Sequence, residues 1–259
     1  MKSAQIPIIQ VIPYVVQDAV TNMAVDEYLL SLSGTILRFY GWKTPVLSFG
    51  RLNQMTDDMD LDFCRSAGIQ GIKRLSGGKT VFHQYELTYA IASDSSLFPS
   101  SIKETYRQLS LPLANAFARF KLHPEMMPDK QESSASSICF KEVSAYELTI
   151  GNKKIVGSSQ FRRKNRFFQH GSILLDIDWD LWKKIWRIPL NATSLEKRIT
   201  TFKEHLQIVP GVDEMCAVLT EEYARTFGAQ AEPLHLTEVD LSLIEELKAK
   251  YRKRLNPFN

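Results

Sequence analysis

Residues 74–92 read RLSGGKTVFHQYELTYAIA, and this stretch does most to decide the fold. It contains two adjacent glycines, Gly77 and Gly78, which allow backbone amides to approach a phosphate or an acyl group closely. Arg74 and Lys79 flank the glycines with positive charge. The spacing matches neither a P-loop nor a GxGxxG fingerprint. A plain turn is the alternative interpretation, and the continuation through TVFHQYELTY is what favours a binding loop.

The elements expected around this loop favour an α+β fold. Strand-like runs are expected at 36–40, 46–49, 87–91, 147–150, 154–156 and 167–175. Helices are expected at 22–32, 101–120, 179–186, 212–227 and 239–255. Pro112 should kink or divide the second helix, and Thr237 with Asp240 resembles a capping arrangement before the last. Strands dominate the first two-thirds without strand–helix alternation, which favours α+β over a Rossmann or barrel fold.

The composition is that of an ordinary globular protein. Of 259 residues, 44% are hydrophobic and 24% charged, which excludes the disordered and collagen-like classes. The net charge of +3 does not argue for nucleic acid as a partner. No apolar run approaches the roughly 20 residues that span a bilayer, and prolines interrupt the N-terminal apolar stretch, unlike a signal peptide. The cysteines Cys64, Cys139 and Cys216 are widely separated, so we expect free thiols and a cytoplasmic location.

Cys139 is a candidate nucleophile. A thiolate can accept an acyl group as a thioester and pass it to an amine. An unperturbed cysteine has a pKa of about 8.5, so reactivity at neutral pH requires a nearby cation or base. Lys154, His170 and His83 are the residues to consider for that role. The alternative is that Cys139 is a small buried residue beside Phe140, and we expect the other two cysteines to be packing residues.

Lys154 begins a second candidate segment, KKIVGSSQ at 153–160. A lysine at the start of a strand that runs into Gly157 and Ser158 can present its ammonium to a carbonyl or phosphate oxygen. A solvated lysine after a turn is the alternative. The basic loop RRKNR at 162–166 is of a kind that is usually solvated, although it can attract an acidic protein or a phosphate. No cluster of His, Cys, Asp or Glu has metal-ligand spacing, so no metal site is expected.

Five segments, taken in order, resemble the family of lipoate–protein ligases and octanoyltransferases, which are relatives of biotin–protein ligases. The segments are NMAVDEYLL at 22–30, LRFYGWKTPVLSFGRLNQ at 37–54, RLSGGKTVFHQYELTYAIA at 74–92, YELTIGNKKIVGSSQ at 146–160 and QHGSILLDID at 169–178. Each is modest alone, but together they cover most of the first 180 residues in the family's order.

The resemblance implies a single catalytic domain over residues 1–259, without a separate C-terminal domain that assists adenylation. Its sheet should be mixed, largely antiparallel and flanked by helices, with a tunnel for a medium-chain acyl group. The product should be an amide on one lysine of a lipoyl domain, carried by the glycine-cleavage H protein or by the E2 subunit of a 2-oxoacid dehydrogenase.

The resemblance also assigns the site residues. Lys154 falls on the family's essential lysine, which contacts the acyl carbonyl or the adenylate phosphate. The residues implied to bind the acyl group are Arg74, Ser76, Gly77, Gly78, His83, Gly157, Ser158 and His170. The family's usual Asp after the loop histidine is Gln84 here.

Two branches of the family remain open. ATP-dependent ligases usually carry a third glycine where this chain has Lys79, whereas cysteine-dependent transferases carry a cysteine shortly before the YEL strand, as Cys139 does. We therefore expect Cys139 to take the acyl group from octanoyl–carrier protein or a lipoylated donor protein. Octanoate or lipoate would be the substrate group, no cofactor would be tightly bound, and ATP with Mg²⁺ would be needed only by the ligase alternative. A monomer is the simplest state at this size.

Overall fold

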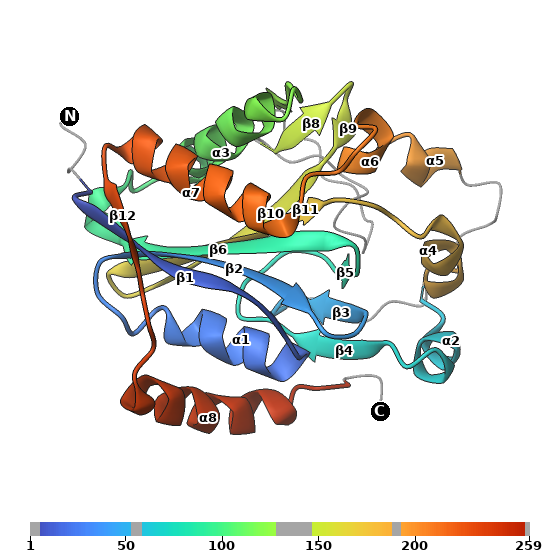
Figure 1. The fold of residues 1–259 in the computed structure, drawn as a ribbon. Helices are drawn as coiled ribbons and strands as arrows, with labels where there is room; N and C mark the ends of the chain where they lie inside the picture. Colours follow the sequence, from blue (N-terminus) through green and yellow to red (C-terminus); the bar gives the residue numbers. More distant parts are fainter. Residues whose placement is uncertain (1–5, 53–58, 128–146, 188–192, 257–259) are drawn as a thin grey trace.

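The computed structural model describes residues 6–52, 59–127, 147–187 and 193–256. A six-stranded sheet forms the centre of the molecule (Figure 1). In spatial order its strands are β10 (Val156–Arg163), β11 (Arg166–Leu174), β6 (Glu86–Asp94), β2 (Thr35–Trp42), β1 (Ile8–Gln17) and β12 (Gln230–Pro233). The pairs from β10 to β2 are antiparallel, whereas β1 is parallel to both β2 and β12. The sheet is therefore mixed, as expected, and the fold is α+β.

Two helix pairs cover the two faces of this sheet. Helices α1 (Ala19–Tyr28) and α8 (Glu238–Arg252) pack together on one face, and α3 (Ile102–Arg119) and α7 (Val212–Phe227) on the other (Figure 1). Side chains along β2 alternate between the two faces of the sheet. Leu37 and Phe39 pack in the core under α3 and α7, whereas Ile36 and Tyr40 pack in the core under α1 and α8.

A smaller sheet packs beside the large one and has a core of its own. It orders β4 (Gln70–Lys73), β3 (Val46–Phe49) and β5 (Val81–His83), with β3 in the middle. Helices α2 (Leu61–Ser66) and α4 (Trp179–Ile185) lie near it in Figure 1. Apolar side chains from the sheet and these helices, including Leu47, Phe82, Cys64 and Trp182, form its core. The site described below lies where this sheet meets β6, β10 and β11.

The remaining elements are short. A third sheet orders β7 (Glu125–Met126), β8 (Leu148–Ile150) and β9 (Lys153–Lys154). The short helices are η1 (Ser95–Leu97), α5 (Thr193–Glu196) and α6 (Phe202–His205). Gly151 and Asn152, both at positive φ, form the tight turn between β8 and β9.

Two expectations about helix signals had different outcomes. The capping box is confirmed: Thr237 Oγ1 accepts from the Asp240 amide, and the Asp240 carboxylate accepts from the Thr237 amide. Pro112 was expected to kink or divide the 101–120 helix; it does not divide it, because α3 is continuous from Ile102 to Arg119. Pro112 is buried there, so packing outweighs the loss of one backbone hydrogen bond.

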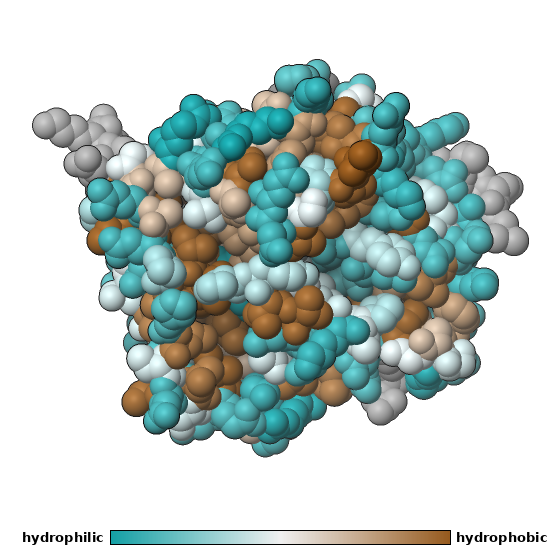
Figure 2. Space-filling model, viewed as in Figure 1, coloured by the Kyte–Doolittle hydropathy of each residue, from teal (hydrophilic) through white to brown (hydrophobic). Residues whose placement is uncertain are grey.

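The face of the molecule in Figure 2 mixes hydrophilic side chains with smaller apolar areas. Within the described residues, no helix combines the length and apolar character needed to span a membrane.

Candidate functional site

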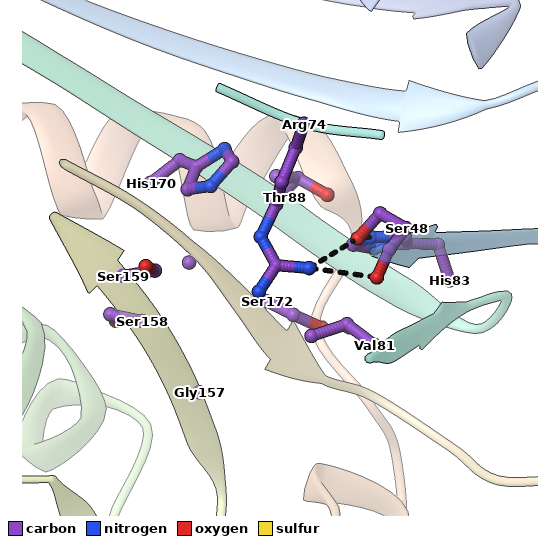
Figure 3. Close-up of a pocket in the computed structure, with 11 residues that line it drawn as sticks. Ser48, Arg74, Val81, His83, Thr88, Gly157, Ser158, Ser159, His170 and Ser172 are labelled. Carbon is purple, nitrogen blue, oxygen red and sulfur yellow. Dashed lines mark hydrogen bonds between the residues drawn. The ribbon is translucent and has the colours of Figure 1, made fainter. Parts of the chain in front are cut away.

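A pocket lies between the six-stranded sheet and the small sheet of β3, β4 and β5 (Figure 3), with about 320 Å³ of empty space that is partly open to solvent. Its lining comes from four parts of the fold: the small sheet together with the glycine loop, β6, β10 and β11. The lining residues are Ser48, Arg74, Val81, His83, Thr88, Gly157, Ser158, Ser159, His170, Gly171 and Ser172. The structure thus brings together five of the residues implied to bind the acyl group: Arg74, His83, Gly157, Ser158 and His170.

Arg74 holds the glycine loop in shape. Its Nη2 donates to the carbonyls of Gly77 and Lys79, both at 2.7 Å. Its Nη1 donates to the backbone and side-chain oxygens of Ser48 at 2.7 and 3.2 Å, and its Nε donates to Ser76 Oγ at 3.1 Å. Ser159 Oγ adds a hydrogen bond to the Gly77 carbonyl at 3.0 Å. The Arg74 guanidinium therefore fixes the loop around the pocket with all three of its nitrogens.

The loop also needs glycine at one position for its backbone. Gly78 has φ of +86°, a conformation that side chains with a Cβ rarely adopt. The Gly78 carbonyl in turn lies so close to Gly50 that a Cβ there would stand 1.9 Å from it. Close approach of these two backbones brings the glycine loop against the end of β3.

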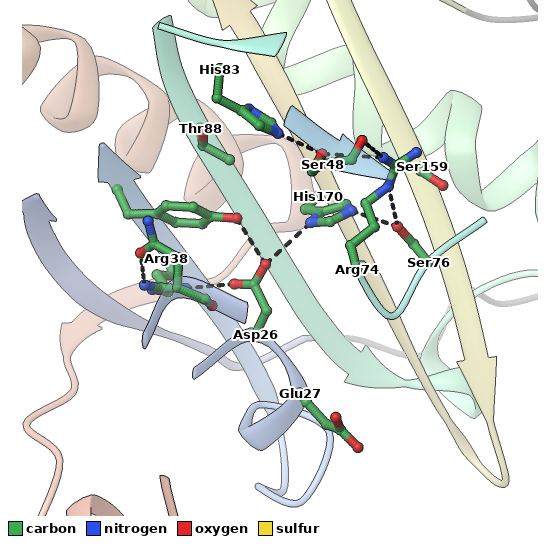
Figure 4. Close-up of polar contacts among 12 residues, drawn as sticks. Asp26, Glu27, Arg38, Ser48, Arg74, Ser76, His83, Thr88, Ser159 and His170 are labelled. Atoms are coloured by element: carbon green, nitrogen blue, oxygen red, sulfur yellow. Dashed lines mark hydrogen bonds and ion pairs between the residues drawn. The ribbon is translucent and has the colours of Figure 1, made fainter. Parts of the chain in front are cut away.

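His170 joins the glycine loop to helix α1 (Figure 4). Its Nε2 lies 2.6 Å from Ser76 Oγ, and its Nδ1 lies 3.1 Å from Asp26 Oδ2. Asp26 also forms a buried ion pair with Arg38 at 2.6 Å and accepts from the Tyr40 hydroxyl at 2.8 Å. Burial lowers the pKa of His170 below its ordinary value, against the opposing effect of Asp26, so the ring is neutral at pH 7.

His83 forms a second chain of the same kind. Its Nε2 lies 2.7 Å from Ser48 Oγ, and its Nδ1 lies 2.7 Å from Glu86 Oε1. The Trp42 ring stacks on the His83 ring with centroids 4.1 Å apart. Burial alone would raise the pKa of Glu86, but His83 and the hydroxyls of Ser172 and Thr88 together hold it below its ordinary value. Glu86 is therefore a carboxylate, and His83 Nδ1 carries the hydrogen that it accepts.

The wall formed by β10 and β11 is tightly packed against β6. Ser158 Oγ lies 2.8 Å from the Tyr89 hydroxyl, which also accepts from Gln169 Nε2 at 3.0 Å. A Cβ on Gly171 would lie 2.4 Å from Ser158 Oγ and 2.5 Å from a Tyr89 ring carbon. Glycine at 171 is what allows β11 to approach these side chains.

Lys154 is buried, which excludes a solvated lysine after a turn. Only 1% of its side chain is exposed, and Nζ donates to Glu147 Oε1 at 2.6 Å. Its backbone pairs with residues 198–200 through the amide of Lys154 and the carbonyl that accepts from Thr200. Lys154 does not line the pocket itself, but it lies three residues before Gly157, which does.

Two of the three cysteines, Cys64 and Cys216, lie within the described residues. Cys139 lies outside the described residues. Burial raises the pKa of the Cys64 thiol to about 11 and that of Cys216 to about 12. Both pack against apolar cores, and both thiols stay protonated at neutral pH, so neither is an activated nucleophile.

The basic loop at 162–166 is partly internal. Arg162 donates to the Pro99 and Ser100 carbonyls, and Arg166 pairs with Asp94 at 2.9 Å. Arg163, more than half exposed, is the guanidinium of this loop that faces solvent. Among the described residues, no group of three or more His, Cys, Asp or Glu side chains could hold a metal ion.

Several residues of the site are not predicted by the sequence reasoning. Asp26 and Glu86 orient the two histidines, and Ser48 lies between His83 and Arg74. The spacing of His83 and Glu86 across a short turn is a local signal that could have identified the second pair. Asp26 has no such signal, because it lies 144 positions from His170.

Comparison with known proteins identifies the family of the chain. The family model of the lipoyl protein ligase A/B catalytic domain matches residues 18–224. Octanoyltransferase LipM of Symbiobacterium thermophilum is 34% identical over 248 residues, which covers 89% of this chain and 90% of that protein. Octanoyltransferase LipM of Staphylococcus aureus is 32% identical and covers 91% of this chain and 93% of that protein.

Solved structures share the fold. Lipoate-protein ligase A bound with ATP superposes with a TM-score of 0.79 at 21% identity, covering 94% of each chain. A bi-partite lipoate protein ligase from Thermoplasma acidophilum gives a TM-score of 0.74 at 20% identity, covering 93% of each chain. The family model spans most of the chain, and the octanoyltransferases match nearly its whole length, so the chain belongs to the lipoyl protein ligase A/B catalytic-domain family.

Proposed function

We propose that this enzyme transfers an octanoyl or lipoyl group from a thioester donor to a specific lysine of a lipoyl domain. The observation that carries the proposal is the similarity to octanoyltransferases over nearly the whole chain. The pocket supports it, because its lining residues lie within four of the five segments in which the sequence resembles the family. The donor is octanoyl–carrier protein or a lipoylated protein, and the acceptor is a lipoyl domain of an H protein or an E2 subunit.

The proposed nucleophile is Cys139. In the first half of the reaction, the Cys139 sulfur attacks the donor thioester; the new carbon–sulfur bond forms, the bond to the donor sulfur breaks, and the proton of the Cys139 thiol goes to the departing donor thiolate. In the second half, the acceptor amine attacks the Cys139 thioester, an amide forms, and the departing cysteine thiolate takes up the proton that the amine loses. Aminolysis of a thioester is downhill, so the cycle needs no ATP.

Lys154 supplies the positive charge that the mechanism needs. Each half passes through a tetrahedral oxyanion, which a preorganised cation in a water-poor site stabilises strongly. The Lys154 ammonium is buried and oriented by Glu147 at 2.6 Å, and the strand that follows it forms one wall of the pocket. The residues of that wall which line the pocket, Gly157, Ser158 and Ser159, are small, which suits an extended acyl chain.

The test is the intact mass of the enzyme after incubation with octanoyl–carrier protein and no acceptor. We expect the enzyme to gain one octanoyl group, which apo lipoyl domain then removes. Cys139→Ala should abolish the gain, and so should Cys139→Ser, with the fold intact. Cys216→Ala is the matched control and should still be acylated, because that thiol is held protonated by burial. A wild-type enzyme that gains no acyl group, or a Cys139→Ala variant that does, would overturn the proposal.

A further inference from the structure

Two hydrogen-bonded series, each made of a carboxylate, an imidazole and a serine hydroxyl, reach the pocket, which Ser48, His83 and His170 line. One is Asp26–His170–Ser76 and the other is Glu86–His83–Ser48. Arg74 connects them, because Nε donates to Ser76 Oγ at 3.1 Å and Nη1 to Ser48 Oγ at 3.2 Å. The two histidines therefore have similar partners, and the difference between them lies at the carboxylates.

The negative charge of Asp26 is balanced by the guanidinium of Arg38. Arg38 Nη1 lies 2.6 Å from Asp26 Oδ1, and both side chains are almost fully buried. The negative charge of Asp26 is thus compensated whether or not His170 is protonated. Since burial also lowers the pKa of His170, this imidazole is a poor acceptor of a proton at neutral pH.

Glu86 differs from Asp26 in this respect. Within the described residues, no Arg or Lys forms an ion pair with its carboxylate. Its other hydrogen bonds come from uncharged donors: the Trp42 indole at 3.2 Å, the Thr88 hydroxyl at 2.5 Å and the Ser172 hydroxyl. The carboxylate is buried, so a proton arriving on His83 would place a positive charge 2.7 Å from it. Among the described residues, His83 is therefore the imidazole of the two whose carboxylate partner has no ion pair with an Arg or Lys.

The proposed reaction needs a base that accepts a proton in only one of its two halves, the transfer to the acceptor lysine. Exchange of one thioester for another is neutral in protons, because one thiol is consumed and one is released. The acceptor lysine, in contrast, arrives as an ammonium and loses two protons on becoming an amide. The Cys139 thiolate can take one of them as it leaves, and a base must take the other.

On the basis of the proposed function, we propose that His83 takes the first proton of the acceptor lysine through the Ser48 hydroxyl, and that Glu86 is the positioning residue for His83. The ammonium gives its proton to Ser48 Oγ as the Ser48 proton moves to His83 Nε2. The free amine then attacks the Cys139 thioester, the carbon–sulfur bond breaks, and the second proton goes to the cysteine thiolate. His83 afterwards releases its proton to solvent.

The surroundings of His83 agree with this direction of transfer. Ser48 Oγ accepts from Arg74, so its own hydrogen points to His83 Nε2, which is free to accept it because Nδ1 carries the ring hydrogen. Arg74 and the neutral His170 line the same pocket as His83. Trp42 stacks on the ring and keeps its edge aimed at Ser48.

The test measures the two halves separately at several pH values. Acylation of the enzyme is followed without acceptor, and transfer is followed from isolated acyl-enzyme to apo lipoyl domain. For Glu86→Gln we expect acylation within about twofold of wild type and transfer slowed at least tenfold near neutral pH. The deficit should shrink as the pH rises, because the acceptor lysine then arrives deprotonated. For His83→Gln the transfer loss should be on the order of 10²-fold, which is typical of removing a general base.

Glu222→Gln is the matched control. Glu222 is also a buried carboxylate, but it lies on α7 and pairs with Arg225 and Arg119. It should lower stability without selective loss of either half. If Glu86→Gln and His83→Gln slow acylation and transfer equally, or leave the pH profile of transfer unchanged, His83 is not the base. The proposed acyl-enzyme would not be affected by that result. If wild-type enzyme forms no acyl-enzyme at all, the proposed function itself has failed.

Discussion

Ser76 Oγ and His170 Nε2 lie 2.6 Å apart although the two residues are 94 positions apart in the sequence. This contact joins the glycine loop to β11 and closes one side of the pocket. Because Arg74 Nε donates to the same hydroxyl, Ser76 aligns a cation and an imidazole at once.

Ser76→Ala should therefore cost both stability and activity. The substitution leaves two buried polar groups, His170 Nε2 and Arg74 Nε, without this partner, which typically costs about 1–3 kcal/mol. We expect a lower free energy of unfolding in a denaturant titration and a lower transfer rate. Ser66→Ala is the control, since that hydroxyl is exposed and bonds only locally to the Phe63 carbonyl; it should change stability by less than about 0.5 kcal/mol. Equal stability of the two variants would contradict the role given to Ser76.

Gly171→Ala should overpack the pocket wall. The added methyl would stand within 2.5 Å of Ser158 Oγ and a Tyr89 ring carbon, so strand or side chains must move. Such overpacking typically costs about 1–3 kcal/mol, and the narrowed wall should raise the KM for the octanoyl donor more than it lowers kcat. For stability, the comparison is Gly77→Ala, where a methyl would meet nothing within 4 Å. A Gly171→Ala enzyme with unchanged KM and stability would show that the acyl group does not use this wall.

Lys154 and Glu147 should behave as a coupled pair. Lys154→Met leaves the Glu147 carboxylate buried without its ammonium, a change that typically costs about 3–5 kcal/mol. Replacing both, as Lys154→Met with Glu147→Leu, should recover much of that loss, because an apolar pair of similar volume removes the unpaired charge. Neither variant should transfer acyl groups. Thermal unfolding and the transfer assay separate the two effects, and an active double variant would exclude Lys154 from the chemistry.

Stability should fall as the solution is acidified below about pH 6.5. Burial lowers the folded-state pKa of His170 below its ordinary value, so between the two values the unfolded chain binds more protons than the folded one. The contribution of neutral His170 is therefore complete above about pH 6.5, the ordinary pKa of histidine, and is lost as the pH falls through the folded-state value. Tm measured from pH 5 to 8 should fall less steeply on the acid side in His170→Asn than in wild type. Parallel curves would refute this assignment.

Local signals predicted the elements whose sequence pattern is unambiguous. The strand runs at 36–40, 46–49 and 87–91 and the capping box of α8 were found from alternation and caps alone. Strand β1 was not predicted, because Pro7 and Pro13 interrupt its pattern. In the structure its pairing to β2 shifts register between Ile12 and Val15, and this irregularity accommodates Pro13.

The site residues that could not be predicted are those whose hydrogen-bond partners lie far away in the sequence. The glycine loop, His83 and His170 could be identified from local composition and family resemblance. Their orienting groups could not, because Asp26 reaches His170 only when α1 packs on the large sheet. Arg74 shows the same limit: its charge suggests a ligand contact, yet packing directs its hydrogen bonds to the carbonyls of the loop itself.

The most direct test of the account is the intact mass of an apo lipoyl domain after incubation with this enzyme under two conditions. One reaction contains octanoyl–carrier protein without ATP, and the other contains free lipoate with ATP and Mg²⁺. We expect the lipoyl domain to gain one octanoyl group in the first reaction and nothing in the second, and Cys139→Ala to abolish the gain. A gain only in the second reaction would contradict it and make the enzyme an ATP-dependent ligase.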